Sequence, residues 1–495
     1  MSALAKGWRH NAGKLASRLG AAPSRLSFGD SIAQAGARLV KKILLILIVK
    51  WKIQAVRTLY NLLFPILFAL SSPYYFLRLW RRGGWKNGFT QRFGFYNDDI
   101  KKCVAGKNFI WLHAVSVGEI NLCVELVRTL ESLSPQLRFL VSTTTTTGMD
   151  ELRKKLPDHI AKIYYPVDFW HCARRALDLI NPRAVIFVEA EIWPNFIWQA
   201  TDRHIPLFLV NARISDRSYP RYLKFAFLFR KLFGSFTVVG AQSEDYAARL
   251  INVGCQPEKV EVTGNIKFDT AKIGNGKSLD IAGLFAQIGV LHDAQILVGG
   301  STHNGEELML AKIFQNLREH FPRLFLVVVP RHFERARDVS LALEKCGIKF
   351  AFRSKITPAT KFDAGMLDCL IVDTTGELMN FYQTATVVFV GKSISAKGGQ
   401  NPIEPAAIGR ATVFGPNMQN FSDVANIFVR GNGVVQVRDA KELEHVLIEL
   451  FNNADRRSEL GATAQAIVRE NQGALLRTAK LILQRIPEDL AGQSE

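Results

Sequence analysis

Short apolar runs alternate with helix-like segments from residue 109 to residue 414, and this alternation constrains the fold more than any other feature. Such runs, bounded by polar loops, are typical of strands buried in a parallel sheet. The stretch Gly264–Lys277 has three glycines and no long apolar run, so it is a candidate linker, after which the alternation restarts. The pattern predicts an α/β fold with two doubly wound domains that face a cleft. The strand-like runs are Phe109–Leu112, Phe139–Val141, Val185–Val188, Leu207–Val210, Thr237–Val239, Ile296–Val298, Leu324–Val329, Leu370–Val372, Val387–Val390 and Thr412–Phe414.

The length of the chain agrees with this division. Its 495 residues exceed the usual size of a single hydrophobic core. We predict five parts, namely a basic N-terminal extension, an apolar segment with a basic flank, a first α/β domain, a linker and a second α/β domain. They cover residues 1–57, 58–92, 93–265, 266–290 and 291–495.

The net charge of +19 is concentrated in the first 92 residues. These contain sixteen Lys or Arg and one acid, Asp30, and carry +15, which leaves +4 for the other 403 residues. A basic protein can bind nucleic acid, but no nucleic-acid-binding motif is visible and the charge lies in the arm. We therefore predict no nucleic-acid partner. The arm is either a solvated extension or a partner for an anionic membrane surface.

An uncharged run of twenty residues, Thr58–Leu77, lies inside this arm. At about 1.5 Å rise per residue, its length suffices to cross the hydrocarbon core of a bilayer. Pro65 and Pro73 are expected to kink or interrupt a helix there. We predict a membrane anchor that spans the bilayer or lies in one leaflet, with a buried core helix as the alternative. Basic residues flank both ends of the run, at Lys50, Lys52, Arg57, Arg78, Arg81, Arg82 and Lys86.

Two other features bear on the cellular compartment. Residues 1–42 are rich in Ala, Ser and Arg and nearly free of acid, which is also the composition of an organelle transit peptide. The six cysteines show no paired spacing. Neither a zinc site nor a disulfide framework is therefore predicted, which fits a reducing compartment.

Polar clusters follow the predicted strands, where doubly wound folds bind their ligands. The most informative is Gly-Gly-Gln-Asn-Pro-Ile-Glu-Pro at 398–405, which opens a helix-like segment. A glycine pair lets the backbone approach a ligand, and amides at a helix start can bind an anion. Glu404, one turn further on, could hold two vicinal sugar hydroxyls. The other clusters are His113–Glu119, Ser142–Gly148, Glu189–Asn195, Asn211–Ser218, Ser301–Glu307, Arg331–Arg335 and Thr374–Glu377.

Nine segments together resemble the 3-deoxy-D-manno-octulosonic acid (Kdo) transferases, membrane-associated enzymes that add Kdo from CMP-Kdo to a lipid A precursor. They occur in family order over about residues 58–485. The segments are HAVSVGE (113–119), STTTTTG (142–148), EAEIWPN (189–195), NARISDRS (211–218), GNIKFD (264–269), STHNGEE (301–307), PRHFER (330–335), DTTGEL (373–378) and GGQNPIEPA (398–406).

The resemblance implies the two-domain GT-B fold and an inverting reaction that needs no metal or cofactor. It also implies an acceptor-binding first domain and a nucleotide-sugar-binding second domain. The chain departs from the family at Gln400, where His is usual, and at Lys392, where Gly is usual. Residues 1–52 have no counterpart in the resemblance.

Three acids are predicted to be catalytic. The resemblance implies that Glu119 is the base that takes the proton of the acceptor hydroxyl. The spacing Ser116-x-x-Glu119 also predicts a helix capping box, and the two roles are compatible. Glu189 and Glu191 follow an apolar strand and suggest an acceptor site or a second carboxylate, with solvated loop acids as the alternative. The resemblance favours one of these two without choosing between them.

The predicted donor-binding residues would stabilise the phosphate of the CMP leaving group or hold its nucleoside. A cation or helix-end amides can stabilise that charge, and the chain has no Asp-x-Asp pair to clamp a metal. His332 could contact cytosine or form a hydrogen bond in the core, and Glu404 is expected on the ribose. The residues are Lys267, Ser301, Thr302, Arg331, His332, Gly399, Gln400, Asn401 and Glu404.

These observations together predict a Kdo transferase at the inner membrane of a bacterium, with its catalytic domains on the cytoplasmic side. An organelle of a plant-like eukaryote is the alternative location. The rival functions are a transferase that uses another nucleotide-sugar, a basic nucleic-acid-binding protein and a membrane scaffold with a decayed site. Competition between CMP and UDP derivatives separates the first rival from the prediction.

Overall fold

The computed structural model describes residues 54–77, 80–81, 86, 88–189, 191–270 and 279–486. The chain forms two compact units, Met1–Trp85 and Lys86–Glu495. The sequence-based expectations for residues 1–53, and for most of the basic residues beside the apolar run, lie outside the described residues.

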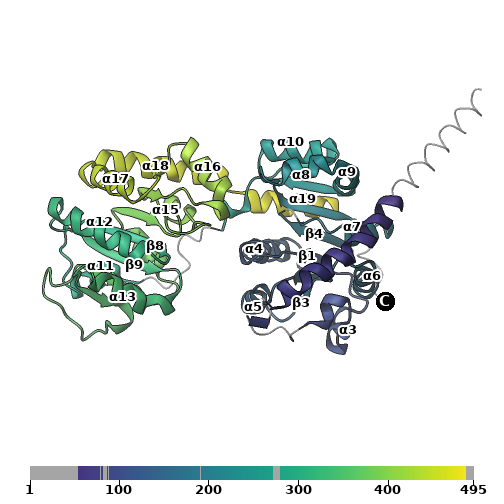
Figure 1. Ribbon diagram of the computed structural model, residues 1–495, viewed down its shortest axis with the longest axis horizontal. Helices are drawn as coiled ribbons and strands as arrows, with labels where there is room; N and C mark the ends of the chain where they lie inside the picture. The colour runs from purple at the N-terminus through teal and green to yellow at the C-terminus, as the bar shows by residue number, and fades with distance from the viewer. Residues whose placement is uncertain are drawn as a thin grey trace, which may run out of the picture. The chain divides into compact units, whose positions relative to one another are not determined.

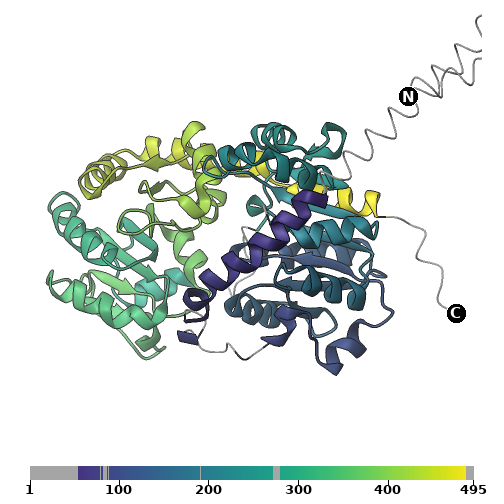
Figure 2. The same cartoon turned by 45° about the vertical axis from the view of Figure 1, so that its right-hand side comes forward.

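The apolar run forms a single helix, Gln54–Leu77, which Figure 2 shows as an uninterrupted purple coil. It is long and apolar enough to cross a membrane, and none of its apolar window is buried. Of the predicted kink or interruption at Pro65 and Pro73, the interruption is wrong, because the helix continues through both. Pro73 has no N–H for the carbonyl of Ala69, and the hydroxyl of Ser72 donates to that carbonyl instead, at 2.9 Å.

The first half of the second unit is built around a parallel seven-stranded sheet (Figure 1). Its strand order is β3-β2-β1-β4-β5-β6-β7, so the direction of winding reverses between β1 and β4. The strands are β1 (Ile110–His113), β2 (Phe139–Thr143), β3 (Ala161–Tyr164), β4 (Ala184–Val188), β5 (Leu207–Ala212), β6 (Val238–Ala241) and β7 (Val260–Val262).

Helices connect these strands, and several begin at side-chain caps that the sequence supplies. Ser116, Thr145 and Ser243 each accept a backbone N–H of the first turn. The helices are η1 (Thr90–Phe93), α3 (Asp98–Val104), α4 (Val117–Leu133), α5 (Thr146–Lys155), α6 (Trp170–Ile180), α7 (Pro194–Asp202), α8 (Tyr219–Lys224), α9 (Ala226–Gly234), α10 (Glu244–Val253), η2 (Pro257–Lys259) and η3 (Ile266–Phe268).

The second half repeats this architecture around another parallel seven-stranded sheet. Its order is β10-β11-β9-β8-β12-β13-β14, and the winding reverses between β8 and β12. The strands are β8 (Ile296–Thr302), β9 (Phe325–Pro330), β10 (Phe350–Phe352), β11 (Cys369–Ile371), β12 (Val387–Val390), β13 (Thr412–Phe414) and β14 (Val435–Gln436).

Helices cover both faces of this sheet (Figure 1). Successive residues of β8 point to opposite faces, so Ile296 and Val298 join one hydrophobic cluster and Leu297 joins the other. The helices are α11 (Ile281–Gln287), α12 (Glu306–His320), η4 (Phe333–Arg335), α13 (Ala336–Glu344), η5 (Arg353–Lys355), α14 (Leu378–Thr384), α15 (Ile403–Ala407), η6 (Gln419–Phe421), α16 (Ser422–Arg430), α17 (Ala440–Asn452) and α18 (Ala454–Asn471). One more helix, α19 (Ala474–Arg485), follows them in the chain.

The C-terminal helix α19 returns to the first half. Ala474, Leu481 and Ile482 are buried with residues of β1, β4 and α4 in one hydrophobic cluster. The sequence-based division placed residues 291–495 in the second domain, and in the structure α19 packs on the first sheet instead. Its register is fixed by Asp269, whose carboxylate accepts the backbone N–H groups of Gly473 and Leu475.

Candidate active site

Many of the predicted site residues lie in or just after the loops at the two points where the winding reverses. In the first half these loops follow β1 and β4 and carry Glu119, Glu189 and Glu191. In the second half they follow β8 and β12 and carry Ser301, Thr302 and residues 391–404. Open α/β sheets bind ligands in the crevice at such a switch point. Two facing sites of this kind suit a reaction between two substrates.

Glu119 lies in the first turn of α4 and is held by two hydrogen bonds. Its Oε2 accepts the backbone N–H of Val115 at 2.9 Å, and its Oε1 accepts the hydroxyl of Ser116 at 2.7 Å. The oxygen of Ser116 accepts the backbone N–H of Glu119 in return, which confirms the predicted capping arrangement. Burial, and then the nearby charge of Glu189, raise the pKa of Glu119 above its usual value. The carboxylate is therefore fixed in place and more basic than an exposed glutamate.

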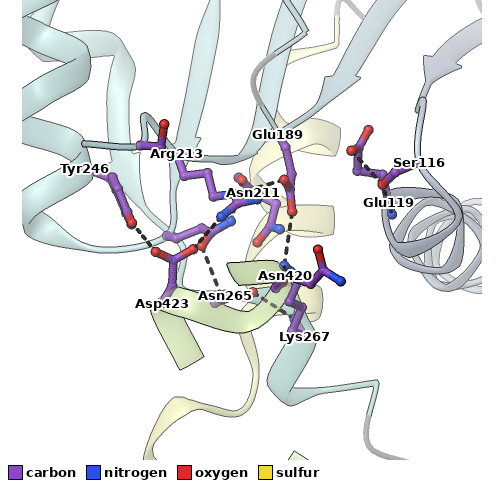
Figure 3. A network of polar contacts seen from close by, with 12 residues as sticks. Ser116, Glu119, Glu189, Asn211, Arg213, Tyr246, Asn265, Lys267, Asn420 and Asp423 are labelled. Carbon is purple, nitrogen blue, oxygen red and sulfur yellow. Dashed lines mark hydrogen bonds and ion pairs between the residues drawn. The ribbon is translucent and has the colours of Figure 1, made fainter. Parts of the chain in front are cut away.

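Glu189 is a buried carboxylate with two cationic partners. Its Oε2 lies 2.9 Å from Nε of Arg213, and its Oε1 lies 3.4 Å from Nζ of Lys267 (Figure 3). Only 7% of the residue is exposed, so this pairing compensates a charge that would otherwise be costly to bury. The alternative of two solvated loop acids is wrong for this position.

Glu191 lies close to the other two acids but has no cationic partner among the described residues. The indole N–H of Trp193 donates to its Oε2 at 3.0 Å. Burial, and then the charge of Glu119, raise the pKa of Glu191 to about 7. Glu191 therefore differs from Glu189, which has two cationic partners.

Arg213 joins the two halves of the unit. Besides Glu189 it contacts Asp423 of α16, with Nη1 2.9 Å from Oδ2. The hydroxyl of Tyr246, from α10, donates to the other oxygen of Asp423, and Figure 3 shows the whole chain of contacts. Lys267 makes a second connection, because its ammonium donates to the carbonyl of Asn420 at 3.4 Å. The acidic site is thus linked to the second half through two cations.

The backbone at this site is strained at four strand ends. Glu189, Asn211, Ser301 and Lys392 have φ of 63°, 50°, 54° and 56°. Residues with a Cβ rarely adopt this left-handed backbone conformation, because it costs about 1–2 kcal/mol per residue. Strain of this kind persists where the surroundings impose it, commonly at functional sites.

Glu306 organises the loops of the second half. Its side chain is fully buried, and its carboxylate accepts the backbone N–H groups of His303, Lys392, Ser393 and Ile394 at 2.6–3.2 Å. The loop after β8 and the loop after β12 are therefore fixed on the same carboxylate. Sequence reasoning placed Glu306 inside a polar cluster but gave it no role.

The glycine loop differs in part from the expectation. A helix does follow it, but α15 spans only the five residues Ile403–Ala407, so its dipole is small. The N–H of Gly399 donates to the carbonyl of Lys392, and that of Gly398 donates to Gln419. The amide of Gly399 is therefore occupied and does not serve as the expected anion donor.

Asn401 and Glu404 interact beside this loop. The side-chain amide of Asn401 donates to Glu404 at 3.2 Å, and its oxygen accepts the N–H of Ile403. Burial raises the pKa of Glu404, while Asn401 and the charge of Arg331 oppose that shift. Gln400 is half-buried and forms no hydrogen bond with the residues that the structure describes.

The remaining predicted donor residues lie at the ends of β8 and β9. Ser301 and Thr302 are buried, and the hydroxyl of Thr302 has no partner in the described part of the chain. Arg331 is exposed and close enough to Glu404 to influence its pKa. His332 is also exposed, so the alternative of a core hydrogen bond is wrong. Over the described ranges, no group of three or more His, Cys, Asp or Glu side chains could hold a metal ion.

The structure thus gathers the predicted residues into an acidic site on the first half and a cluster of loops on the second. It adds Arg213, Glu306 and Asp423, which sequence reasoning missed. Arg213 and Glu306 lie inside the predicted polar clusters, so the sequence indicated their location but not their role. Asp423 lies in an ordinary helix start and carried none.

Comparison with known proteins defines the class. A glycosyltransferase from Rickettsia africae aligns over 77% of this chain and 99% of its own, with a TM-score of 0.50 and 14% identity. That similarity shows a shared fold, the GT-B architecture of two doubly wound halves. The two parallel sheets and the paired switch points define the chain as a protein of the GT-B fold.

Sequence comparison then gives the family. The family described as 3-Deoxy-D-manno-octulosonic-acid transferase (kdotransferase) matches residues 87–270. The 3-deoxy-D-manno-octulosonic acid transferase of Haemophilus influenzae is 32% identical over 421 residues, which cover 84% of this chain and 93% of the relative. The enzyme of the same name from Bordetella pertussis is 30% identical over 435 residues, covering 82% and 95%. The chain belongs to the Kdo transferase family.

Proposed function

We propose that this protein transfers Kdo from CMP-Kdo to a lipid A precursor, with inversion and without a metal, in lipopolysaccharide core biosynthesis. Membership of the Kdo transferase family supports the transferred sugar. The observation that carries the mechanism is the arrangement of Glu119, a fixed carboxylate with a raised pKa at the switch point of the first half.

Glu119 is the general base in this mechanism. Its two hydrogen bonds use one acceptor site on each oxygen, and each oxygen has a further lone pair for a proton. A raised pKa strengthens a carboxylate as a base at neutral pH. Glu189 is unsuited to this task because Arg213 and Lys267 already hold its charge. Glu191 has no such pairing and remains the alternative base.

The proposed reaction is a single displacement at the anomeric carbon of Kdo. The acceptor hydroxyl gives its proton to Glu119 while its oxygen forms the new bond to that carbon. The bond between the anomeric carbon and the CMP phosphate oxygen breaks, and CMP leaves with the electron pair. Attack from the face opposite CMP inverts the configuration.

Protein cations supply the charge stabilisation that the leaving phosphate needs. Arg331 lies close to Glu404 on the donor side, and Lys267 lies between Glu189 and Asn420. Positive groups aimed at developing negative charge lower the barrier of such a reaction. Glu404, held by Asn401, is the proposed contact of the ribose hydroxyls.

The proposed location is the cytoplasmic face of a bacterial inner membrane, with the anchor in residues 58–92. One described helix, Gln54–Leu77, is long and apolar enough to enter a bilayer. The first domain, proposed at 93–265, would receive the lipid acceptor. The second, proposed to follow the 266–290 linker, would hold the donor.

The decisive test replaces Glu119 by glutamine. Glutamine keeps the size of the side chain, its oxygen can accept the N–H of Val115 and its amide can donate to Ser116. The free energy of unfolding should therefore fall by no more than a helix cap contributes, about 0.5–2 kcal/mol. Losing the base should lower turnover by about 10²–10⁴. Turnover is measured with CMP-Kdo and a tetra-acylated lipid A precursor, and mass spectrometry counts the sugars added.

The matched control is Glu125→Gln on the same helix, where Glu125 pairs with Arg128 on the surface. This variant should retain wild-type turnover. Near-normal turnover of Glu119→Gln would leave Glu119 a structural cap and move the base to Glu191. A wild-type protein that uses UDP-sugars in preference to CMP-Kdo would refute the proposed donor.

A further inference from the structure

Lys392 follows β12 in a backbone conformation that suits glycine. Its φ of 56° is left-handed, and its N–H donates to Oε2 of Glu306 at 2.6 Å. Its carbonyl accepts the N–H of Gly399 at 2.9 Å. The hydrogen bonds to Glu306 and Gly399 therefore hold Lys392 in this strained conformation. They also fix the direction in which its side chain leaves the backbone.

The side chain of Lys392 lies against the bare face of Gly398. A Cβ on Gly398 would stand 3.2 Å from its Cε, 3.4 Å from its Nζ and 2.9 Å from Nδ2 of Asn420. The carbonyl of Asn420 accepts the ammonium of Lys267. The side chains of Lys392 and Asn420 therefore both lie beside Gly398, and Asn420 also contacts Lys267.

These two lysines differ in their pairing. Lys267 has the carboxylate of Glu189 as a counter-ion at 3.4 Å. The ammonium of Lys392 has no hydrogen bond or ion pair with any residue that the structure describes, although the residue is only partly exposed. The left-handed backbone costs stability at this residue.

An anion would compensate this charge, and two of the neighbouring backbone N–H groups are not available to bind one. The N–H groups of Gly398 and Gly399 are occupied, and α15 is a single turn. Lys392 also follows Gly391, whose position would bring a Cβ within 2.6 Å of the backbone of Ser301 and Thr302. The free cation therefore stands at the switch point of the second half, between the ends of β8 and β12.

We infer that the ammonium of Lys392 binds an oxyanion of the sugar donor. This inference rests on the proposed function, because CMP-Kdo carries two such groups, the phosphate of CMP and the carboxylate of the octulosonic acid. A charge-assisted bond to either group fixes the donor against the glycine loop. Lys392 is thus a donor-binding residue that replaces the occupied amides.

The test is Lys392→Met, which removes the charge and keeps the length of the side chain. Losing a hydrogen bond to a charged group should raise the KM for CMP-Kdo by about tenfold or more. The matched control is Lys397→Met, an exposed lysine of the same loop, which should keep the wild-type KM. Lys392→Arg should stay within a few-fold of wild type.

Calorimetry with CMP alone distinguishes the two anions. A weaker affinity for CMP assigns Lys392 to the phosphate. An unchanged CMP affinity with a raised KM for CMP-Kdo assigns it to the sugar carboxylate. If Lys392→Met changes neither the affinity for CMP nor the KM for CMP-Kdo, the inference is overturned.

Lys392→Gly separates binding from folding. Glycine adopts φ of 56° without strain, so the melting temperature should hold or rise while the KM for CMP-Kdo rises as in Lys392→Met. A raised melting temperature with a wild-type KM would also overturn the inference. Failure of the proposed function has another signature, because the wild-type protein itself would then not turn over CMP-Kdo.

Discussion

Replacing Glu191 by glutamine should change how the stability of the protein depends on pH. Burial and the charge of Glu119 raise the pKa of Glu191 to about 7, from 4.5. The folded protein therefore holds this proton more tightly than the unfolded chain does. Stability from this group is fully present below pH 4.5 and is lost as the pH rises to about 7.

The size of the effect follows from the shift. At 1.36 kcal/mol per pKa unit, a rise from 4.5 to about 7 corresponds to about 3 kcal/mol. Glutamine has no proton to lose and can still accept the indole N–H of Trp193. The wild-type protein should therefore lose stability between pH 5 and pH 8 relative to Glu191→Gln.

The measurement is the melting temperature of both proteins at pH 5, 6, 7 and 8 in the same detergent. The melting temperature of the variant should rise relative to that of the wild type as the pH rises. At pH 8 it should be several degrees higher. Glu459→Gln, an exposed substitution on α18, is the control and should follow the wild-type curve. Parallel curves for Glu191→Gln and wild type would falsify the assignment of this proton to Glu191.

Two further predictions concern the membrane arm and the donor loop. Removing residues 1–85 should release the protein from lipid vesicles at high salt, and continued sedimentation with the vesicles would place the anchor elsewhere. The cut belongs at 85 because Arg92 contacts Tyr164 in the second unit. Gln400→His should keep activity and tighten donor binding at mildly acidic pH, because histidine can become cationic there. A loss of more than about tenfold, roughly 1.4 kcal/mol, would show that the loop cannot accept a cation at 400.

The sequence predicted the interior of both sheets and missed their edges. All ten predicted strands are present, within a few residues of their expected bounds. The four strands that were not predicted, β3, β7, β10 and β14, are the edge strands of the two sheets. An interior strand is apolar on both faces, whereas β7 and β10 are partly exposed and have no continuous buried run.

The site was predictable only as far as single residues reveal their chemistry. The family motifs marked Glu119 and Glu404, and Glu189 and Glu191 stood out as acids after an apolar strand. The pairing of Glu189 with Arg213 and Lys267 depends on segments 24 and 78 residues apart in the chain, and no local pattern reveals it. The strain at Lys392 is equally hidden, because it depends on the buried carboxylate of Glu306.

The return of α19 to the first sheet has a consequence for how the protein is made. Ala474, Leu481 and Ile482 complete the hydrophobic cluster of the half that is synthesised first, yet they lie near the end of the chain. A nascent chain folds from its N-terminus as it leaves the ribosome. The first sheet must therefore wait, with part of its apolar surface uncovered, until the ribosome has translated the whole second half. A premature stop that removed only the last helix would accordingly damage the half of the protein farthest from it in sequence.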